Sequence, residues 1–211
     1  MSPPGPIRGV RPVGDRGFLV ELPGNREVHL LAAAVRDHFG ARIEDVVPGA
    51  QTVLLAWADP PPSAAELIAE LETLDLTPPA EADSDPVTIP VRYDGDDLEA
   101  VAAAVGVDVD RVIELHAGPE YLVAFMGFAP GFAYMTGGSP ELELPRRDDP
   151  RPRVPAGSVA IANRYSAVYP TPSPGGWHLL GHTDVVLFDA DRDPPALLEP
   201  GARVVFEPLS R

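Results

Sequence analysis

Four arginines fall within eight positions of one proline-rich segment, PRRDDPRPRVPAGSV (residues 145–159). They are Arg146, Arg147, Arg151 and Arg153. The planar fork of a guanidinium group binds a carboxylate or a phosphate through two hydrogen bonds. Because proline cannot donate a backbone hydrogen bond, the segment is not expected to be a central strand. It predicts either an anion receptor or internal ion pairs with the adjacent aspartates or with the acidic helices upstream.

Two other segments combine aromatic residues with glycine and proline. MGFAPGFAYM (126–135) contains Phe128, Phe132 and Tyr134, and YPTPSPGGW (169–177) ends in Trp177. Glycine permits close backbone approach, and aromatic rings supply a flat apolar wall, so both segments suit a ligand site. The alternative is that the rings are ordinary core residues that fix loops.

The five histidines do not form a metal-binding pattern. His178 and His182 lie four positions apart, but in the expected strand WHLLG this spacing spans about 13 Å, so we predict no metal in this chain. His116 lies at the expected end of a helix, where a cation is favourable. Ser158 or Ser173 can be combined with a histidine and an aspartate too easily for a catalytic triad to be predicted.

The composition excludes several kinds of chemistry. All sixteen basic residues are arginine, and there is no cysteine. The chain therefore supplies no Walker A, Schiff-base or amidase lysine, no disulfide and no thiolate. A net charge of −16 disfavours binding to nucleic acid. We expect a cytoplasmic protein with no membrane partner, since no stretch resembles a signal peptide or a membrane span.

The first part of the chain alternates short apolar runs with helical patterns. The spacing of apolar residues predicts a helix over 26–39, and Ser63 with Glu66 predicts a capping box that starts a second helix. Strands are expected at 17–22, 41–47 and 52–58. If residues 87–93 return to the same sheet, the order is βαββαβ. We therefore predict a small α+β domain of the split-βαβ type, with its linker, over residues 1–86.

The remainder of the chain is expected to be mainly β. Acidic residues start predicted helices at 96–105 and 108–117. From Tyr121 onward, short apolar runs separated by glycine and proline predict a small β-barrel or sandwich. The polar stretch TPPAEADSDP (77–86) predicts a linker. We therefore expect a barrel domain with two short leading helices over residues 87–211.

Three long segments, in this order and spacing, resemble one known family. They are GFAPGFAYM, PRRDDPRPRVPAGSVAIA and YPTPSPGGWHLLG, and IRGVRPVGDRGFLVEL extends the likeness to nearly the whole chain. The sequence is similar to the B-type subunit of bacterial ATP-dependent 5-oxoprolinase. The family also includes the KipI kinase inhibitor and proteins labelled allophanate hydrolase subunit 1. The sequence departs from the family's usual pattern at Ala117, Tyr165, Ser166, Ala167, Val168, His182 and Asp184.

The resemblance implies a fold and an assembly. It implies an α+β domain followed by a cyclophilin-like β-barrel. It also implies a larger cyclophilin-like partner, which is the C-type subunit of 5-oxoprolinase or a protein of the allophanate hydrolase subunit 2 type, and a third subunit. Together these subunits open the lactam of 5-oxoproline to L-glutamate at the expense of ATP. Because this chain has no lysine, we expect ATP to be bound at the level of the complex and this chain not to be catalytically autonomous.

The implied substrate assigns roles within these segments. 5-Oxoproline carries one carboxylate and a lactam carbonyl that must be activated. We predict that Arg147 or Arg153 receives the anion and that His116 polarises the carbonyl or shuttles a proton. The remaining predicted substrate-binding residues are Phe132, Tyr134, Trp177, Ser158 and Ser173. Two alternatives stay open: a KipI-type protein that inhibits a sensor histidine kinase, and a subunit of a urea- or allophanate-metabolising amidohydrolase.

Overall fold

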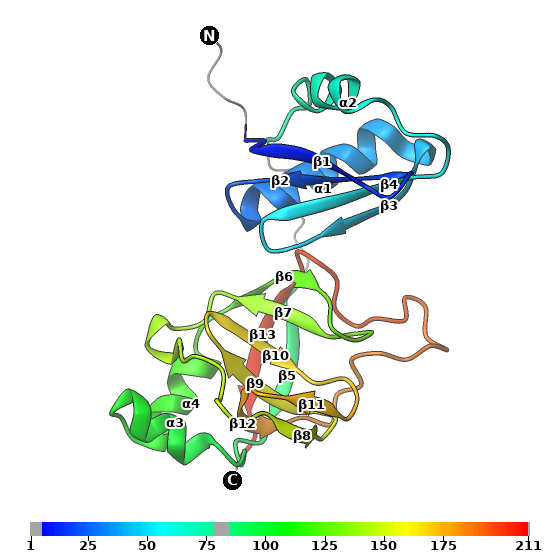
Figure 1. Ribbon diagram of the computed structural model, residues 1–211. Helices are drawn as coiled ribbons and strands as arrows, with labels where there is room; N and C mark the ends of the chain where they lie inside the picture. Colours follow the sequence, from blue (N-terminus) through cyan, green and yellow to red (C-terminus); the bar gives the residue numbers. More distant parts are fainter. Residues whose placement is uncertain (1–5, 78–84, 211) are drawn as a thin grey trace. The chain divides into compact units, whose positions relative to one another are not determined.

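The chain forms two compact units, each with its own hydrophobic core. The computed structural model describes residues 6–77 and 85–210. One unit lies within residues 1–83 and the other within residues 84–211. Figure 1 shows the elements of both units. Among the described residues, no helix is long and apolar enough to cross a membrane.

The first unit is a four-stranded antiparallel sheet with two helices. The sheet order is β1-β2-β4-β3, and its elements are β1 (Gly9–Val13), β2 (Gly17–Glu21), α1 (Asn25–Phe39), the 3-10 turn η1 (Gly40–Arg42), β3 (Ile43–Pro48), β4 (Thr52–Trp57) and α2 (Ala64–Leu71). The predicted capping box is present, because Ser63 accepts from the backbone of Glu66 and the Glu66 side chain accepts from the backbone of Ser63. The apolar stripe of α1 is buried as its spacing predicted.

The predicted α+β class is confirmed, but the expected strand order in the first unit is wrong. Val87–Val91 does not join this sheet; it pairs in parallel with a strand of the second unit. Ile89 and Val91 are fully buried there, which explains its preference for the barrel. One edge of the first sheet is instead β1, whose mostly exposed side chains and Pro12 gave no alternating pattern.

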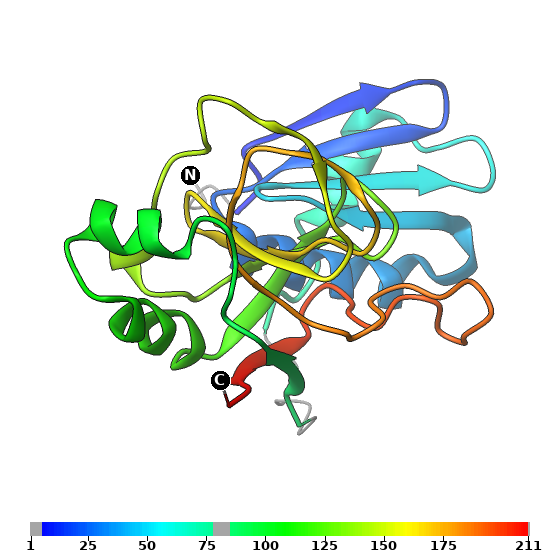
Figure 2. The same cartoon turned by 90° about the horizontal axis from the view of Figure 1, so that it is seen from below.

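The second unit is a seven-stranded sheet that curls into a nearly closed barrel, as predicted (Figure 1 and Figure 2). The sheet order is β12-β9-β10-β7-β6-β13-β5, and β8 with β11 forms a separate two-stranded ribbon. The strands are β5 (Val87–Val91), β6 (Tyr121–Met126), β7 (Ala133–Thr136), β8 (Arg151–Val154), β9 (Ser158–Ala162), β10 (Tyr165–Val168), β11 (Ser173–Gly175), β12 (His178–His182) and β13 (Arg203–Pro208).

Two helices follow β5, close to the ranges predicted for them. They are α3 (Leu98–Val105) and α4 (Val109–Ala117), which lie side by side, and a 3-10 turn, η2 (Pro140–Leu142), packs near them (Figure 2). Asp108 caps α4 by accepting from the backbone N–H of Arg111. Asp97 precedes α3 without capping it through its side chain.

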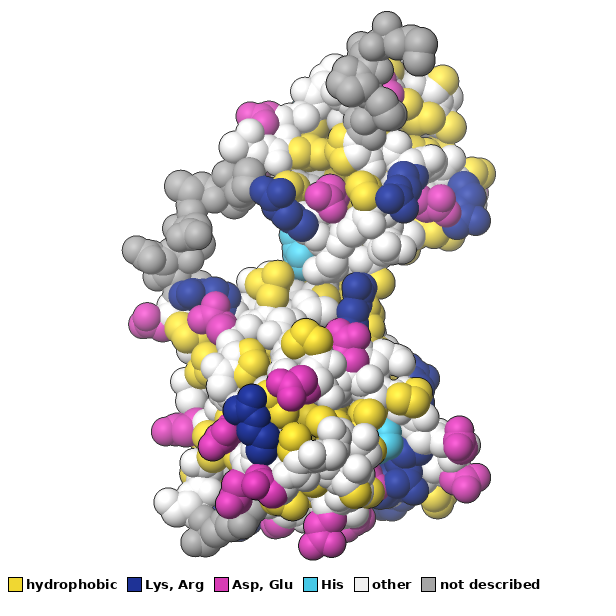
Figure 3. Space-filling model, turned by 90° about the vertical axis from the view of Figure 1, so that its left-hand side faces the viewer, with side chains coloured by type: hydrophobic (Ala, Val, Ile, Leu, Met, Phe, Trp, Pro, Cys, Tyr) yellow, Lys and Arg dark blue, Asp and Glu magenta, His cyan; other side chains and the backbone are white. Residues whose placement is uncertain are grey.

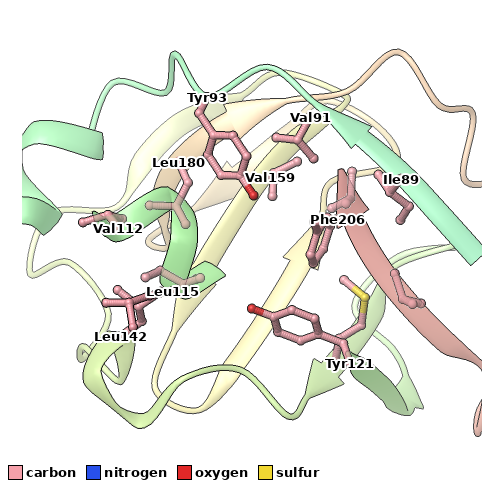
Figure 4. Packing of buried hydrophobic residues seen from close by; sticks show 14 of the residues in the cluster. Ile89, Val91, Tyr93, Val112, Leu115, Tyr121, Leu142, Val159, Leu180 and Phe206 are labelled. Carbon is pink, nitrogen blue, oxygen red and sulfur yellow. The ribbon is translucent and has the colours of Figure 1, made fainter. Parts of the chain in front are cut away.

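Apolar side chains fill the barrel and also cover the outer face of one strand. Figure 4 shows the interior, where Tyr93 and Tyr121 approach the middle of the cluster from different segments. In β9, Val159 and Ile161 belong to this interior, whereas Ala160 and Ala162 pack against a second apolar layer outside it. Strand β9 is therefore buried on both faces. On the surface drawn in Figure 3, acidic side chains are scattered with exposed apolar side chains between them.

The barrel closes along a seam between the end of β5 and β12. Arg92 and His182 exchange two backbone hydrogen bonds of 2.9 Å. The backbones approach so closely that a Cβ on Gly181 would lie 2.2 Å from the carbonyl oxygen of Arg92. A Cβ on Gly95 would lie 2.3 Å from the carbonyl oxygen of Leu179. Closure of the barrel therefore requires glycine at both positions.

Gly181→Ala is expected to destabilise the second unit by about 3 kcal/mol, since the new methyl group collides with backbone. The matched control is Gly106→Ala, where φ is +81° but nothing lies within 4 Å of the added Cβ. Backbone strain alone makes this control cost about 1 kcal/mol. Urea unfolding followed by Trp177 fluorescence in a Trp57→Phe background reports on the second unit. An equal loss of unfolding free energy in Gly181→Ala and Gly106→Ala would contradict the steric role of Gly181.

Candidate functional site

The three glycine- and proline-rich segments meet at one pocket, which we call the aromatic pocket. Its volume is about 230 Å³, and it lies on the outer layer of the barrel sheet. Five aromatic rings and one arginine line most of the pocket, and prolines and glycines of the same segments line the rest. The six larger side chains are Phe128, Phe132, Tyr134, Arg146, Tyr169 and Trp177. Segments more than 40 positions apart in the sequence therefore build a single small site.

The rings of the pocket contact one another edge to face. The Phe132 and Trp177 centroids lie 5.7 Å apart at 86°, and Tyr134 lies 5.7 Å from Trp177. Tyr169 lies 5.3 Å from Phe132. Phe132, Tyr134 and Trp177, predicted as a substrate-binding wall, are thus neighbours, and their role in binding stays a prediction. Such edge-to-face contacts stabilise the arrangement of the rings beyond the area that they bury.

Local backbone geometry shapes the rim of this pocket. Phe128 has a φ of +67°, which is rare for a residue other than glycine, and its side chain is 61% exposed. Gly131 in the same turn has a φ of +79°, and a Cβ there would lie 2.6 Å from Cβ of Phe188. Strain of this kind persists only where the surroundings enforce it. The strained backbone of this turn places the exposed ring of Phe128 in the lining of the pocket, with its centroid 5.1 Å from that of Phe132.

Arg146 brings the positive charge to the aromatic pocket. Among the described residues, no acidic side chain lies within ion-pair distance of it, and its side chain lines the pocket beside Tyr134 and Tyr169. Burial raises the pKa of both tyrosines, and the charge of Arg146 partly opposes this rise. Both phenols therefore stay protonated at neutral pH. The pocket thus offers a guanidinium, two hydroxyl groups and an apolar wall.

Two other arginines of the segment are held by a buried carboxylate. Arg147 Nη1 donates to Oδ1 of Asp97 at 2.5 Å, and Arg151 Nη2 donates to the same oxygen at 2.8 Å. The side chain of Asp97 is 3% exposed, and its other oxygen accepts from the backbone N–H of Leu179 at 2.7 Å. Burial would raise the pKa of Asp97, but these hydrogen bonds and both arginine charges hold it below its ordinary value.

Backbone contacts tie the same segment to the loop that carries Trp177. The N–H of Arg147 donates to the carbonyl of Gly176 at 2.8 Å, and the ring of His178 contacts the carbonyl of Pro145 at 2.8 Å. Strands β8 and β11 pair in antiparallel. The backbone on both sides of Arg146 is therefore fixed, which sets the direction of its side chain.

The arginines predicted as anion receptors lie elsewhere. Arg147 is paired with Asp97, and Arg153 is exposed on β8 and does not line the aromatic pocket. An anion-binding role for either one stays a prediction, whereas the geometry brings Arg146 to the wall. The expected internal ion pairs do occur, but with Asp97 before α3 rather than with the neighbouring Asp148 and Asp149.

His116 is fully buried in the barrel core and does not line the aromatic pocket. Its Nδ1 lies 2.7 Å from the hydroxyl of Tyr93, and its Nε2 lies 2.8 Å from Oγ of Ser166. Phe206 packs against the ring at 4.5 Å. Burial lowers the pKa of His116 to about 3, so the imidazole is neutral. The catalytic role predicted for it would require exchange with solvent that this packing opposes.

The two serines predicted to bind substrate lie apart from the wall. Ser158 lines a different pocket, beside the barrel seam. Ser173 is in β11, and its buried Oγ has no hydrogen-bond partner among the described residues. Within the same part of the chain, no group of three histidine or acidic side chains is placed to hold a metal ion.

Comparison with known proteins identifies the family. The model of the carboxyltransferase domain, subdomains C and D, matches residues 8–198. The chain is 39% identical over 193 residues to the B-type subunit of 5-oxoprolinase from Escherichia coli O157:H7, covering 90% of this chain and 88% of that protein. The chain belongs to the family of B-type 5-oxoprolinase subunits. The resemblance found in the three sequence segments is thereby confirmed.

Solved structures extend this family assignment. The crystal structure of TTHA0988 matches with a TM-score of 0.82 and 39% identity over 93% of this chain. This chain covers only 41% of TTHA0988, so the matching region there is part of a longer polypeptide. The urea amidolyase of K. lactis matches 98% of this chain with a TM-score of 0.72 at 19% identity, which shows a shared fold.

Asp97→Asn is expected to destabilise the second unit by about 3 kcal/mol at neutral pH, because it leaves two arginines without their counter-charge. Asp96→Asn, the exposed neighbour, should change the free energy of unfolding by at most about 0.5 kcal/mol. Urea unfolding followed by Trp177 fluorescence, in the same Trp57→Phe background, measures both.

The pH dependence tests the ionisation state of Asp97 in the same experiment. Since the folded-state pKa of Asp97 is depressed, its stabilisation is complete above the unfolded pKa near 4 and is lost as pH falls through the folded value. The gap in unfolding free energy between wild type and Asp97→Asn should therefore narrow below about pH 4. A gap that stays constant down to pH 3 would contradict an ionised Asp97.

Proposed function

We propose that this chain is a non-autonomous subunit of an ATP-dependent 5-oxoprolinase complex, which opens the lactam of 5-oxoproline to L-glutamate. The observation that carries the proposal is the convergence of the three signature segments on one small pocket with a guanidinium beside an aromatic wall. The E. coli relative, which is named as a 5-oxoprolinase subunit, supports it over nearly the full chain.

The pocket suits a compact, singly carboxylated ring. Its volume of about 230 Å³ lies below the range of about 300–1,000 Å³ that accommodates drug-sized ligands. Arg146 can bind a carboxylate through two hydrogen bonds. Phe132 and Trp177 would then contact the apolar edge of the lactam ring, and the phenols of Tyr134 and Tyr169 are within the same lining.

The lining of the pocket supplies groups that bind and orient a substrate. Its charged group is the guanidinium of Arg146, and burial raises the pKa of its two phenols. We therefore assign proton transfer and ATP chemistry to a second, larger subunit and a third subunit. TTHA0988, in which the matching region is 41% of a longer chain, is consistent with a site that further polypeptide completes.

Omission of this subunit is expected to abolish turnover of the reconstituted complex. The measurement is release of glutamate and ADP from 5-oxoproline and ATP, with this chain alone and each incomplete set of subunits as controls. Undiminished turnover without this chain would overturn the proposed function. Turnover of urea in place of 5-oxoproline by the complete complex would instead favour the urea-metabolising alternative.

Arg146→Ala is expected to lower kcat/KM for 5-oxoproline by about 10- to 100-fold, the cost of one charge-assisted hydrogen-bonded contact. Arg146→Lys should recover part of this loss, since it restores the charge without the planar fork. Arg153→Ala is the matched control from the same segment, and wild-type kinetics are expected because its side chain lies away from the pocket. A larger loss of kcat/KM in Arg153→Ala than in Arg146→Ala would instead assign the anion-binding role to Arg153.

A further inference from the structure

A second pocket lies beside the barrel seam and shares no lining residue with the aromatic pocket. Its volume is about 300 Å³. Its lining includes Ser158 from β9, His182 from β12 and Asp94 from the chain that follows β5. We call it the seam pocket.

These three side chains come from adjoining segments of the barrel. Ser158 is directly opposite His182 in the antiparallel pair of β9 and β12. Side chains of directly opposed residues lie on the same face, with Cβ atoms about 4.5–5.5 Å apart. On the other side of β12, the seam places Asp94 two residues after Arg92, the backbone partner of His182. Hydroxyl, imidazole and carboxylate therefore follow one another across the sheet.

The carboxylate orients the imidazole. His182 Nδ1 lies 2.7 Å from Oδ1 of Asp94, so the Nδ1–H donates to the carboxylate in the neutral imidazole. This tautomer leaves the lone pair of Nε2 available as a base. Within the described residues, Nε2 of His182 has no hydrogen-bond partner. Both side chains are partly exposed, at 40% for His182 and 49% for Asp94, so solutes can reach the ring.

The hydroxyl of Ser158 is a polar group in the lining of the seam pocket. Ser158 is 5% exposed and lines the seam pocket, and its Oγ makes no hydrogen bond to the described part of the chain. Oγ of Ser158 is absent from the buried, unpartnered side-chain atoms of the described residues, so the oxygen keeps accessible surface. The atom is placed to meet a small molecule that enters the pocket.

We propose that Ser158, His182 and Asp94 form a second site, a nucleophilic one that takes small uncharged or cationic esters. Oγ of Ser158 attacks the ester carbonyl while Nε2 of His182, which does not contact this hydroxyl in the structure, takes the hydroxyl proton directly or through one water. The bond to the leaving alcohol then breaks, and His182 returns the proton to that alcohol. Water next attacks the acyl-serine with His182 as base, which releases the acid and restores Ser158.

Charge at the rim defines the class of substrate. Asp96 and Asp184 line the pocket in addition to Asp94. Three carboxylates around one hollow repel anions and favour neutral or positively charged molecules. The seam pocket is thus opposite in charge preference to the aromatic pocket, where Arg146 favours an anion.

The test is covalent labelling of the purified full-length chain with an uncharged fluorophosphonate, read by peptide mass spectrometry. Wild type should be modified at Ser158, and Ser158→Ala should not be modified. His182→Gln should slow labelling by about 100-fold or more, the typical contribution of a general base. Asp94→Asn should slow it by about 10- to 100-fold through loss of orientation. An anionic phosphonate of the same size should label more slowly than the uncharged one.

Matched controls separate this chemistry from non-specific reaction. Ser139→Ala removes another serine of the same unit, and His178→Gln removes the other histidine of β12. Both should label at the wild-type rate. Since Asp94 and His182 are partly exposed, their variants carry the test even if Ser158→Ala fails to fold, which circular dichroism would show. An unmodified Ser158 in wild type, or His182→Gln labelled at the wild-type rate, would overturn the proposal.

Discussion

The arginine segment, the start of α3 and strand β12 are held together by the hydrogen bonds of one carboxylate, that of Asp97. It is almost fully buried at the start of α3, where it binds two arginines and the backbone of β12 at once. A carboxylate in such a place is stable only with these partners, so the three parts must come together in one geometry. Arg146 is adjacent to Arg147 in the chain, so Asp97, which does not line the aromatic pocket, helps to set the direction of Arg146 together with the backbone contacts of Arg147 and Pro145.

Local sequence patterns predicted those parts of the fold whose cause is local. Helix α1 and the capping box of Ser63 and Glu66 depend on spacings of three or four residues. Such spacings can be read directly from the sequence. The strand that pairs with Val87–Val91 could not be predicted from a local pattern. The alternation within Val87–Val91 fits any half-buried sheet, and its choice of β13 depends on which core Ile89 and Val91 can fill. That information lies more than 100 residues further along the chain.

The same distinction applies to the candidate site. Residue types predicted an aromatic wall beside an arginine segment, and the structure brings these together. Type and spacing could not distinguish Arg146 from Arg147 or Arg153, because the direction of a side chain in an extended segment depends on tertiary contacts. The signal that decides it is Asp97, about 50 positions earlier, which from the sequence was only an acidic residue near a helix start. His116 illustrates the converse, since Phe206, 90 positions later, encloses it.

Because β9 is buried on both faces, the aromatic pocket also depends on residues that do not line it. Ala160 and Ala162 support the layer that holds Phe132 and Trp177, and neither is among the residues that line the aromatic pocket. Interiors are close-packed, so one added methylene at either position pushes the wall outward. The depth of the aromatic pocket therefore depends partly on two residues behind the wall that do not line it. A larger side chain at either position would change the space in the aromatic pocket without changing any residue that lines it.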